Sequence, residues 1–462
     1  LAIDYENNDE LVKRLEKALS ALQSETPATW NALQAHGIYR GSGTPGKTVF
    51  MFPGQGSQYV NMIRDLRDVE PVVRDTFLEA DAILTPILGK PLTSYIYADG
   101  NDEALAQAEK ELKNTTITQP ALLTANVALL RLMAKFGFSP DFVIGHSLGE
   151  YAALVASGVL TFNEALEVVS ARGREMSRIK VDDPGGMAAV SAPLDVVEKV
   201  IASVEGYIVI ANVNSPLQSV LGGTSEAIEA AIARFQADGY QAVRIPVSHA
   251  FHTKIVAPAS EPVRSVIERM NVMPPRIPIV ANVTGELYPG SAEEITDLLA
   301  RQVASPVQFV KSMQTLYDAG ARVFVEIGPK RVLNALAADN MKGKTGTIVL
   351  ATNHPRKGGQ ASFNEALCGL FAAGVMPLNS ATYFQNASGE KTIFDAGKDF
   401  SSLTTENPVV RLTGSVVVTG AGLGLPGRNA HVFDDDNIES MMAGKMRIEA
   451  LPENIRKDML DK

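Results

Sequence analysis

The segment 141–149 constrains the fold more than any other part of the chain. An apolar strand pattern at 141–145 runs into the sequence GHSLG at 145–149, and a helical pattern follows. A G-x-S-x-G turn between a strand and a helix raises the serine hydroxyl above the edge of a sheet. The free N–H groups at the start of that helix stabilise developing negative charge. The segment therefore predicts that Ser147 is a nucleophile on a sheet of the α/β class.

Other strand and helix patterns extend this prediction along the chain. Apolar strand patterns occur at 48–52, 141–145, 277–283 and 323–327. Helical patterns occupy 58–86 and 119–136. Strands that alternate with helices in this way are typical of a parallel, doubly wound sheet.

The middle of the chain has a different pattern. Strands are expected at 186–192, 207–213, 218–222 and 241–247, with helices at 193–204 and 224–238. The order βαββαβ is that of a ferredoxin-like unit. Because parallel-sheet patterning resumes afterwards, we expect a small subdomain, at about 185–247, inserted into a larger domain.

The remaining segments suggest a domain organisation. An amphipathic helix at 5–23 and a linker make up 1–46, the main domain covers 47–350, and a second linker covers 351–410. A fresh strand at 415–419 predicts that 411–462 is the truncated start of another domain. The chain opens at Leu1 without a Met or a basic leader, so we expect it to be a piece of a longer polypeptide.

Composition excludes several classes of function. The formal net charge is −10 and there is no basic tract, which argues against nucleic-acid or anionic-membrane partners. The uncharged run at 114–130 contains Gln119, Pro120 and several Thr, and is a poor membrane span. A single cysteine, Cys368, allows no intrachain disulfide and fits a reducing compartment. We therefore expect a cytoplasmic location.

A nucleophilic serine needs a base, and histidine is the usual one. Of the six histidines, His146 adjoins the serine and should project away from it, and three others lie in linker-like or terminal segments. His249 and His252 remain, and sequence spacing does not choose between them. Two histidines three apart could also bind zinc, but no third ligand lies nearby, so no metal site is expected.

Arg172 is a candidate for binding a substrate carboxylate. A capping box at 161–164 begins its helix. Ten residues of helix rise about 15 Å, so an antiparallel pair of helices would return Arg172 to the level of Ser147. A guanidinium beside a nucleophile suits a bidentate grip on a carboxylate.

The loop at 53–58 is a candidate for the oxyanion site. It is the first β-to-α turn of the predicted sheet, so it should lie at the same edge as the serine. The backbone N–H of Gln55 could donate to the oxyanion together with that of Leu148.

The chain resembles a known family, the malonyl-CoA:acyl-carrier-protein acyltransferases. The matching motifs are FPGQGSQ at 52–58, TQPALLTANVAL at 118–129, GHSLGE at 145–150, SARGREM at 170–176, HAFH at 249–252 and ARQVASPVQF at 300–309. They stand in the family's order and cover about 47–350. The resemblance implies an α/β-hydrolase-like core with a parallel sheet and an inserted ferredoxin-like subdomain.

The resemblance also implies roles for individual residues. It assigns His252 as the base and Gln302 as the residue whose carbonyl group orients it in place of a triad acid. It matches Gln55 and Leu148 to the oxyanion donors, and Arg172 to the carboxylate-binding arginine.

Two further sets of pocket residues follow from the resemblance alone. Gln119 matches a pocket glutamine of unassigned role. The HAFH box is the form found in malonyl-selective domains of modular polyketide synthases, so His249 and Phe251 are expected to contact the substrate.

The implied reaction is ping-pong acyl transfer with no bound cofactor. Malonyl-CoA is the expected substrate, and the phosphopantetheine thiol of an acyl carrier protein is the expected acceptor. The sequence VVVTGAGLGLPG at 416–427 resembles the opening of a ketosynthase domain, which implies neighbouring domains of a polyketide or polyunsaturated-fatty-acid synthase in the same polypeptide. An acyltransferase followed by a ketosynthase departs from the usual order.

Two other functions stay open on the sequence. A thioesterase or esterase of the same fold would need an Asp or Glu to orient the histidine, and the segment 300–309 offers Gln302 instead. A non-catalytic scaffold would not need Ser147, His252 and Arg172 together.

Overall fold

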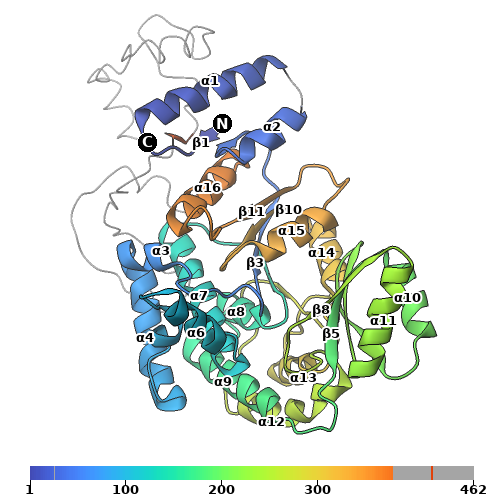
Figure 1. Ribbon diagram of the computed structural model, residues 1–462. Helices are drawn as coiled ribbons and strands as arrows, with labels where there is room; N and C mark the ends of the chain where they lie inside the picture. The colour runs from blue at the N-terminus through green and yellow to red at the C-terminus, as the bar shows by residue number, and fades with distance from the viewer. Residues whose placement is uncertain (25–26, 378–417, 420–462) are drawn as a thin grey trace, which may run out of the picture. The chain divides into compact units, whose positions relative to one another are not determined.

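The computed structural model describes residues 1–24, 27–377 and 418–419 (Figure 1). The chain forms two compact units. Unit 1 contains Leu1–Gly43 and Leu367–Val375, and unit 2 contains Thr44–Ala366. All the predicted site residues lie in unit 2.

Unit 1 holds the predicted amphipathic helix, which is confirmed as α1 (Asn8–Ser24) and is followed by α2 (Pro27–Gln34). Three short antiparallel strands lie in the order β12-β1-β2: β1 (Ala2–Ile3), β2 (Ile38–Tyr39) and β12 (Val418–Thr419). Ile3, Ala18 and Ile38 are among the buried side chains that form its core.

The centre of unit 2 is a parallel sheet of five strands in the order β11-β10-β3-β4-β9. Its strands are β3 (Lys47–Phe52), β4 (Phe142–Gly145), β9 (Ile279–Val280), β10 (Ala321–Glu326) and β11 (Ile348–Ala351). All neighbours in this sheet pair in parallel, so the carboxyl ends of the strands meet at one edge. The predicted α/β parallel sheet is confirmed.

Helices cover both faces of this sheet (Figure 1). On one face, α8 (Gly149–Ala156) packs on β3 and β4, and α7 (Thr115–Lys135) and α9 (Phe162–Arg178) pack on α8. Further from the sheet, α4 (Pro71–Leu88) packs on α7 and α12 (Ser260–Ile267) packs on α9. On the other face, α14 (Phe309–Asp318) and α15 (Val332–Asn340) pack on strand side chains such as Met51, Ile144 and Phe324. Unit 2 also contains α3 (Arg64–Val69), α5 (Thr93–Ile96), α6 (Asp102–Leu112), the 3₁₀ turn η1 (Lys254–Ala259) and α13 (Ala292–Gln302).

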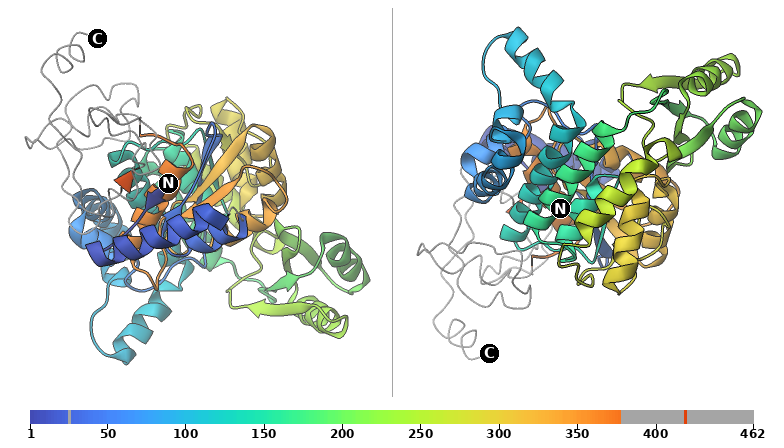
Figure 2. Two further views of the ribbon diagram at one scale, coloured as in Figure 1. Left: turned by 90° about the horizontal axis from the view of Figure 1, so that it is seen from above. Right: turned by 90° about the horizontal axis from the view of Figure 1, so that it is seen from below.

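The small subdomain has the predicted ferredoxin-like topology. Its elements are β5 (Gly186–Ser191), α10 (Leu194–Ser203), β6 (Ile208–Ser215), β7 (Gln218–Gly223), α11 (Ser225–Ala237) and β8 (Gln241–Ile245). The strands are antiparallel in the order β6-β7-β5-β8. Figure 2 shows this green part extending from the rest of unit 2. Two backbone hydrogen bonds tie β6 to the chain after α13, from Val213 to Val307 and from Val307 to Ala211, both 2.9 Å.

The structure differs from the sequence prediction at three elements. The helix predicted at 58–86 is divided into α3 and α4, because Pro71 lacks an N–H and begins a new helix. The strand predicted at 277–283 shortens to β9, because Pro278 has no N–H to donate to the ladder. The helix predicted at 119–136 begins earlier, at Thr115, where the Asn114 side chain caps it.

The segment 351–410, predicted as a linker, contains a helix. This helix is α16 (Gly359–Ala372), and Phe363, Leu367 and Leu370 are buried along it. Their spacing of three and four residues places them on one helix face, a pattern that the surrounding Gly and Asn residues obscured. The other domain boundaries stay predictions. The rest of that linker and the ketosynthase-like segment 411–462 lie outside the described residues, apart from 418–419.

Within the described residues, α7 is long and apolar enough in length and composition to cross a membrane. Its most apolar stretch is 89% buried inside the protein, which is typical of a core helix. It packs against α4, α8 and α9.

Candidate active site

Ser147 lies in the sharp turn between β4 and α8. Its φ of +51° is in the left-handed region, which a non-glycine residue adopts only where its surroundings hold it. A Cβ on Gly149 would lie 1.9 Å from the carbonyl oxygen of Phe52, so only glycine allows α8 to approach β3 here. The predicted strand–turn–helix elbow is therefore present, and it places the serine at the carboxyl edge of the sheet.

The His252 side chain meets this serine. Its Nε2 lies 2.6 Å from Ser147 Oγ, and its Nδ1 lies 3.0 Å from the Ser305 carbonyl oxygen and 3.2 Å from that of Gln302. A carbonyl oxygen only accepts hydrogen bonds, so Nδ1 carries the proton and Nε2 is free to accept the serine proton. Burial, with help from the charges of Arg172 and His146, lowers the pKa of His252 to about 3. The imidazole is therefore a neutral base at physiological pH.

The tertiary structure separates the two candidate bases. The ring nitrogens of His249 lie 3.2 Å from Ser248 Oγ and 3.3 Å from the Ile179 carbonyl oxygen, rather than at the nucleophile. His252, three residues later, has a φ of +59°. The neighbouring Phe251 is buried, with 8% of its surface exposed. The substrate contacts expected for His249 and Phe251 stay predictions.

Arg172 lies in the interior near Ser147, as the helix geometry predicts. Its side chain is buried, and it donates from Nη1 to Gln119 Oε1 at 3.0 Å and from Nη2 to Gln302 Oε1 at 3.4 Å. Its Nε has no hydrogen-bond partner within the described part of the chain. Two amide oxygens thus hold the guanidinium while leaving N–H groups available to an anion.

The side chain of Gln302 also contacts the nucleophile. Its Nε2 donates to the Ser147 carbonyl oxygen at 2.8 Å and to Glu150 Oε2 at 3.0 Å. The backbone carbonyl of the same residue accepts from His252. One residue at the end of α13 therefore contacts the serine, the histidine and the arginine.

Sequence reasoning missed Asn282, which follows β9. Its Oδ1 accepts from the Ser147 N–H at 2.6 Å, and its Nδ2 donates to the Gly145 carbonyl at 2.7 Å. Asn282 therefore holds the backbone on both sides of the elbow. Its place just after a strand of the parallel sheet was a usable signal, because such positions gather at the edge where ligands bind.

Glu150 is the second residue that sequence reasoning left out, although it lies in the quoted GHSLGE motif. Its carboxylate accepts from the Asn282 N–H at 3.0 Å, the Tyr288 hydroxyl at 2.7 Å and Gln302 Nε2 at 3.0 Å. Burial raises its pKa to about 7, against the opposing effect of these hydrogen bonds and of Arg172. A glutamate in an apolar helix next to the nucleophile was the signal that could have found it.

The expected oxyanion donors lie beside the serine. Leu148 precedes the first turn of α8, whose N–H groups face the carboxyl edge. The loop after β3 lies against the elbow, since a Cβ on Gly54 would be 2.4 Å from the His146 carbonyl and 3.4 Å from the Leu148 nitrogen. Gln55 is the next residue, and its side chain contacts Thr115 Oγ1 at 3.4 Å. The oxyanion role of these two N–H groups stays a prediction.

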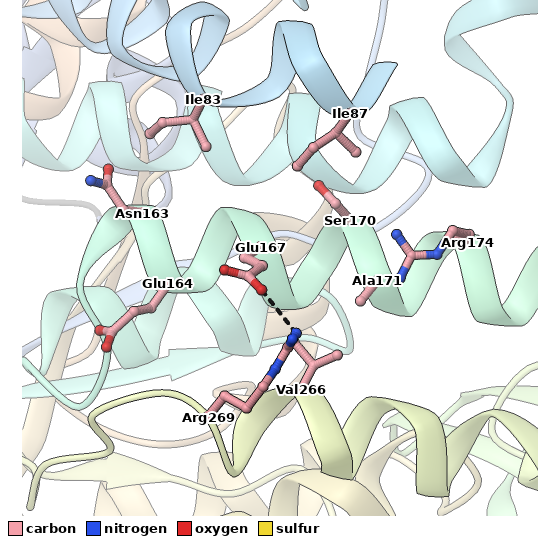
Figure 3. Close-up of a pocket in the computed structure, with 10 residues that line it drawn as sticks. All are labelled: Ile83, Ile87, Asn163, Glu164, Glu167, Ser170, Ala171, Arg174, Val266 and Arg269. Carbon is pink, nitrogen blue, oxygen red and sulfur yellow. Dashed lines mark hydrogen bonds and ion pairs between the residues drawn. The ribbon is translucent and has the colours of Figure 1, made fainter. Parts of the chain in front are cut away.

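A cavity of about 520 Å³ lies elsewhere, between α4, α9 and α12 (Figure 3). Ser170 and Arg174 line it, two residues before and two after Arg172. Residues two apart on a helix point in nearly opposite directions, so this cavity is on the far side of α9 from the nucleophile. Among the described residues, no three His, Cys, Asp or Glu side chains are grouped so as to hold a metal ion.

The assembled groups suit acyl transfer. A serine hydroxyl faces a neutral imidazole at the start of a helix, and a guanidinium is buried near them, the set of groups expected for transfer of an acyl group with a carboxylate. The two acceptors at His252 Nδ1 are backbone carbonyls, where a hydrolase triad has a carboxylate.

Comparison with known proteins agrees with this chemistry. Residues 49–376 match the family model "Acyl transferase domain". The malonyl CoA-acyl carrier protein transacylase of Bacillus subtilis is 37% identical over 297 residues, which are 63% of this chain and 89% of that protein. The spectinabilin polyketide synthase system protein NorB of Streptomyces orinoci is 34% identical over 335 residues, 72% of this chain. The chain spans only 15% of the length of NorB.

A solved structure has the same fold. It is that of a malonyl-transacylase in complex with its type II polyketide synthase acyl-carrier protein, with a TM-score of 0.61 and 32% identity. The likeness covers 70% of this chain and 99% of that one.

Proposed function

The chain belongs to the acyl transferase domain family, and from this premise we propose that it moves a malonyl group from coenzyme A to the phosphopantetheine thiol of an acyl carrier protein. The observation that carries the proposal is the contact of 2.6 Å between Ser147 Oγ and His252 Nε2, next to the buried guanidinium of Arg172. The pair of Ser147 and His252 supports acyl transfer, and Arg172 selects an acyl group with a free carboxylate.

In the first half-reaction, Ser147 Oγ attacks the thioester carbonyl while its proton passes to His252 Nε2. The N–H groups of Leu148 and Gln55 stabilise the oxyanion. The carbon–sulfur bond then breaks, and the proton on His252 goes to the sulfur of the leaving coenzyme A. In the second half-reaction, the carrier thiol gives its proton to His252 and attacks the serine ester, and Ser147 recovers a proton as it leaves.

Arg172 acts on the other end of the acyl group. Its Nη1 and Nη2 each donate one hydrogen bond to an amide oxygen, so its Nε–H and the remaining N–H groups can bind the malonyl carboxylate. The buried site strengthens this attraction, because water does not screen it.

The expected result of the simplest test is a malonyl adduct on Ser147. The protein is incubated separately with malonyl-CoA, acetyl-CoA and methylmalonyl-CoA, and its intact mass is measured. Malonyl-CoA should add one malonyl group that persists without carrier protein, and the Ser147→Ala variant should add none. Rapid hydrolysis of malonyl-CoA without an adduct would favour a thioesterase, and no reaction with any thioester would favour a scaffold.

For the carrier partner, we infer a docking surface at one end of the sheet edge. Lys330 and Arg331 follow β10, Arg356 and Lys357 follow β11, and we call these four residues the basic edge. Lys330 Nζ donates to the carbonyl oxygen of Gly56, in the loop after β3, at 2.9 Å.

The basic edge follows strands of the same sheet as the strand that leads to Ser147. Strands of a sheet are about 4.8 Å apart, and β10 and β11 are two and three strands from β4, so the ends of these strands are about 10–14 Å from the end of β4, where the serine turn begins. Arg331 and Arg356 are exposed, whereas Lys357 pairs with Glu365 at 2.7 Å. An acidic partner that carries its thiol on a flexible arm fits this surface. The whole chain has a net charge of −10, so such a partner needs a local basic surface of this kind.

Reversing two charges of the basic edge should slow only the second half-reaction. We expect Arg331→Glu/Arg356→Glu to lower the rate of malonyl transfer to carrier protein about 10-fold at low salt, because charge complementarity mainly sets the association rate. Loading from malonyl-CoA should not change. Lys199→Glu/Arg234→Glu, on exposed helices of the small subdomain, is the control. An equal loss in both half-reactions would show that the edge binds coenzyme A phosphates instead.

We propose that the domain works inside a cytoplasmic synthase, next to a ketosynthase domain in the same polypeptide. The support is the resemblance of 416–427 to a ketosynthase opening and the likeness to NorB, a polyketide synthase system protein of which the chain spans 15%. Mass spectrometry of the full-length polypeptide would test this arrangement.

A further inference from the structure

A closed set of hydrogen bonds surrounds the nucleophile and includes a buried carboxylate with no role in the reaction above. We propose that Glu150 is a positioning residue that sets the orientation of the Gln302 amide and, through it, the malonyl selectivity of Arg172. This inference rests on the proposed function, and its test separates the two.

The hydrogen bonds of the Gln302 side chain fix the orientation of its amide. Its NH₂ group faces the Ser147 carbonyl oxygen at 2.8 Å and Glu150 Oε2 at 3.0 Å. The Ser147 carbonyl only accepts hydrogen bonds, and so does the Glu150 carboxylate above its pKa of about 7, so the amide nitrogen faces them there. The amide oxygen is thereby directed to the opposite side.

The orientation of the Gln302 amide in turn affects Arg172. The Gln302 Oε1 atom accepts from Arg172 Nη2 at 3.4 Å, and a guanidinium only donates. If the amide turned over, its NH₂ would face the guanidinium, and the guanidinium would lose one of its two amide acceptors. The other acceptor, on Gln119, would then hold only Nη1. The plane of the guanidinium, and with it the grip on a substrate carboxylate, would no longer be set.

Three hydrogen bonds hold Glu150 itself in place. Its Oε1 accepts from the backbone N–H of Asn282 and from the Tyr288 hydroxyl, while Oε2 accepts from Gln302. The Glu150 side chain is fully buried, and the backbone N–H of Asn282 that it accepts from cannot rotate away as a side chain could. The carboxylate therefore presents an acceptor to Gln302 at a fixed place.

Glu150→Gln keeps the size of the side chain but offers only one acceptor atom. That oxygen is needed by the Asn282 N–H, so the new NH₂ group faces the NH₂ group of Gln302 and opposes the amide orientation that the Ser147 carbonyl favours. We expect the preference for malonyl-CoA over acetyl-CoA, as the ratio of the two kcat/KM values for loading, to fall at least about 10-fold. Loading of acetyl-CoA should fall by less than about 3-fold, because acetyl has no carboxylate for Arg172 to hold.

Gln302→Leu supplies an independent second variant, since it removes the amide but keeps the backbone carbonyl at His252. It should lose the same selectivity, and Glu150→Gln added to it should lose almost no more. A double-mutant cycle of this kind measures whether two residues act through one another. If the two losses in selectivity instead multiply, or if Gln302→Leu keeps the malonyl preference, the proposal is overturned.

Glu326→Gln is the matched control. Glu326 is also fully buried, burial also raises its pKa to about 7, and it accepts from the backbone N–H groups of Val332 and Asn334 at the start of α15. The variant should lower the melting temperature without changing the malonyl-to-acetyl ratio. Wild-type protein that loads no malonyl group would refute the proposed function, whereas wild-type selectivity in Glu150→Gln would refute only this inference.

Discussion

Replacing His252 with alanine should slow acylation of Ser147 by about three to four orders of magnitude, at the upper end of the effect of a general base. The reason is geometric, because Nε2 lies 2.6 Å from Ser147 Oγ and Nδ1 is held by two carbonyl oxygens. The matched control is His249→Ala, three residues earlier, whose ring is bonded to Ser248 and Ile179. The measurement is the rate of adduct formation, followed by intact mass. Similar losses in the two variants would contradict the assignment of the base.

The same residue sets the expected pH dependence. The pKa of His252 is lowered to about 3, so the base is already neutral at pH 5 and gains nothing as the pH rises through 6.5. Serine modification by an uncharged fluorophosphonate should therefore proceed at a nearly level rate from pH 8 to pH 5, and fall only as the pH approaches the lowered pKa. This reagent has no carboxylate, so its reaction does not depend on the grip of Arg172. A rate that halves near pH 6.5 would show that burial does not lower the pKa of His252.

Arg172→Ala is expected to lower kcat/KM for malonyl loading about 100- to 1000-fold, the usual cost of truncating one partner of a buried, hydrogen-bonded charge pair. Acetyl loading should change little, because the hydrogen bonds of Arg172 go to Gln119 and Gln302, and its effect is on the substrate carboxylate. Arg172→Lys should recover only part of the loss, since an ammonium group does not reproduce the planar fork held by Gln119 and Gln302.

Arg174→Ala serves as the control for this prediction. It lies two residues further along α9 and lines the cavity on the far side of the helix (Figure 3). Its removal should leave malonyl selectivity unchanged. Equal losses of malonyl and acetyl loading in Arg172→Ala would indicate that the arginine supports the fold of the site and does not select the substrate.

The fold was largely predictable, because its signals are local. Short apolar runs before glycine turns identified β3 and β4, and the βαββαβ order identified the small subdomain. Two of the predictions that differ from the structure lie where a proline outweighs the periodic pattern. Pro71 separates α3 from α4, and Pro278 shortens β9.

The candidate site was predictable only in part. Ser147 was identified from its own elbow, and Arg172 from the length of its helix, since each argument uses neighbours along the chain. Asn282 was missed because its partner Ser147 is 135 residues away and no motif joins the two. Glu150 was missed because its carboxylate acts on Gln302, which is 152 residues away.

The sequence by itself therefore determined the parallel sheet, the inserted subdomain, the serine elbow and the resemblance to acyltransferases. Sequence spacing left His249 and His252 open and the resemblance assigned His252, and the tertiary structure places His252 Nε2 2.6 Å from Ser147 Oγ. Only the tertiary structure showed that the Ser305 carbonyl joins that of Gln302 at this histidine and that Glu150 and Asn282 surround the nucleophile. The physical reason is that periodicity and turn chemistry act over a few residues, whereas the direction of a hydrogen bond between distant side chains depends on how the strands and helices pack.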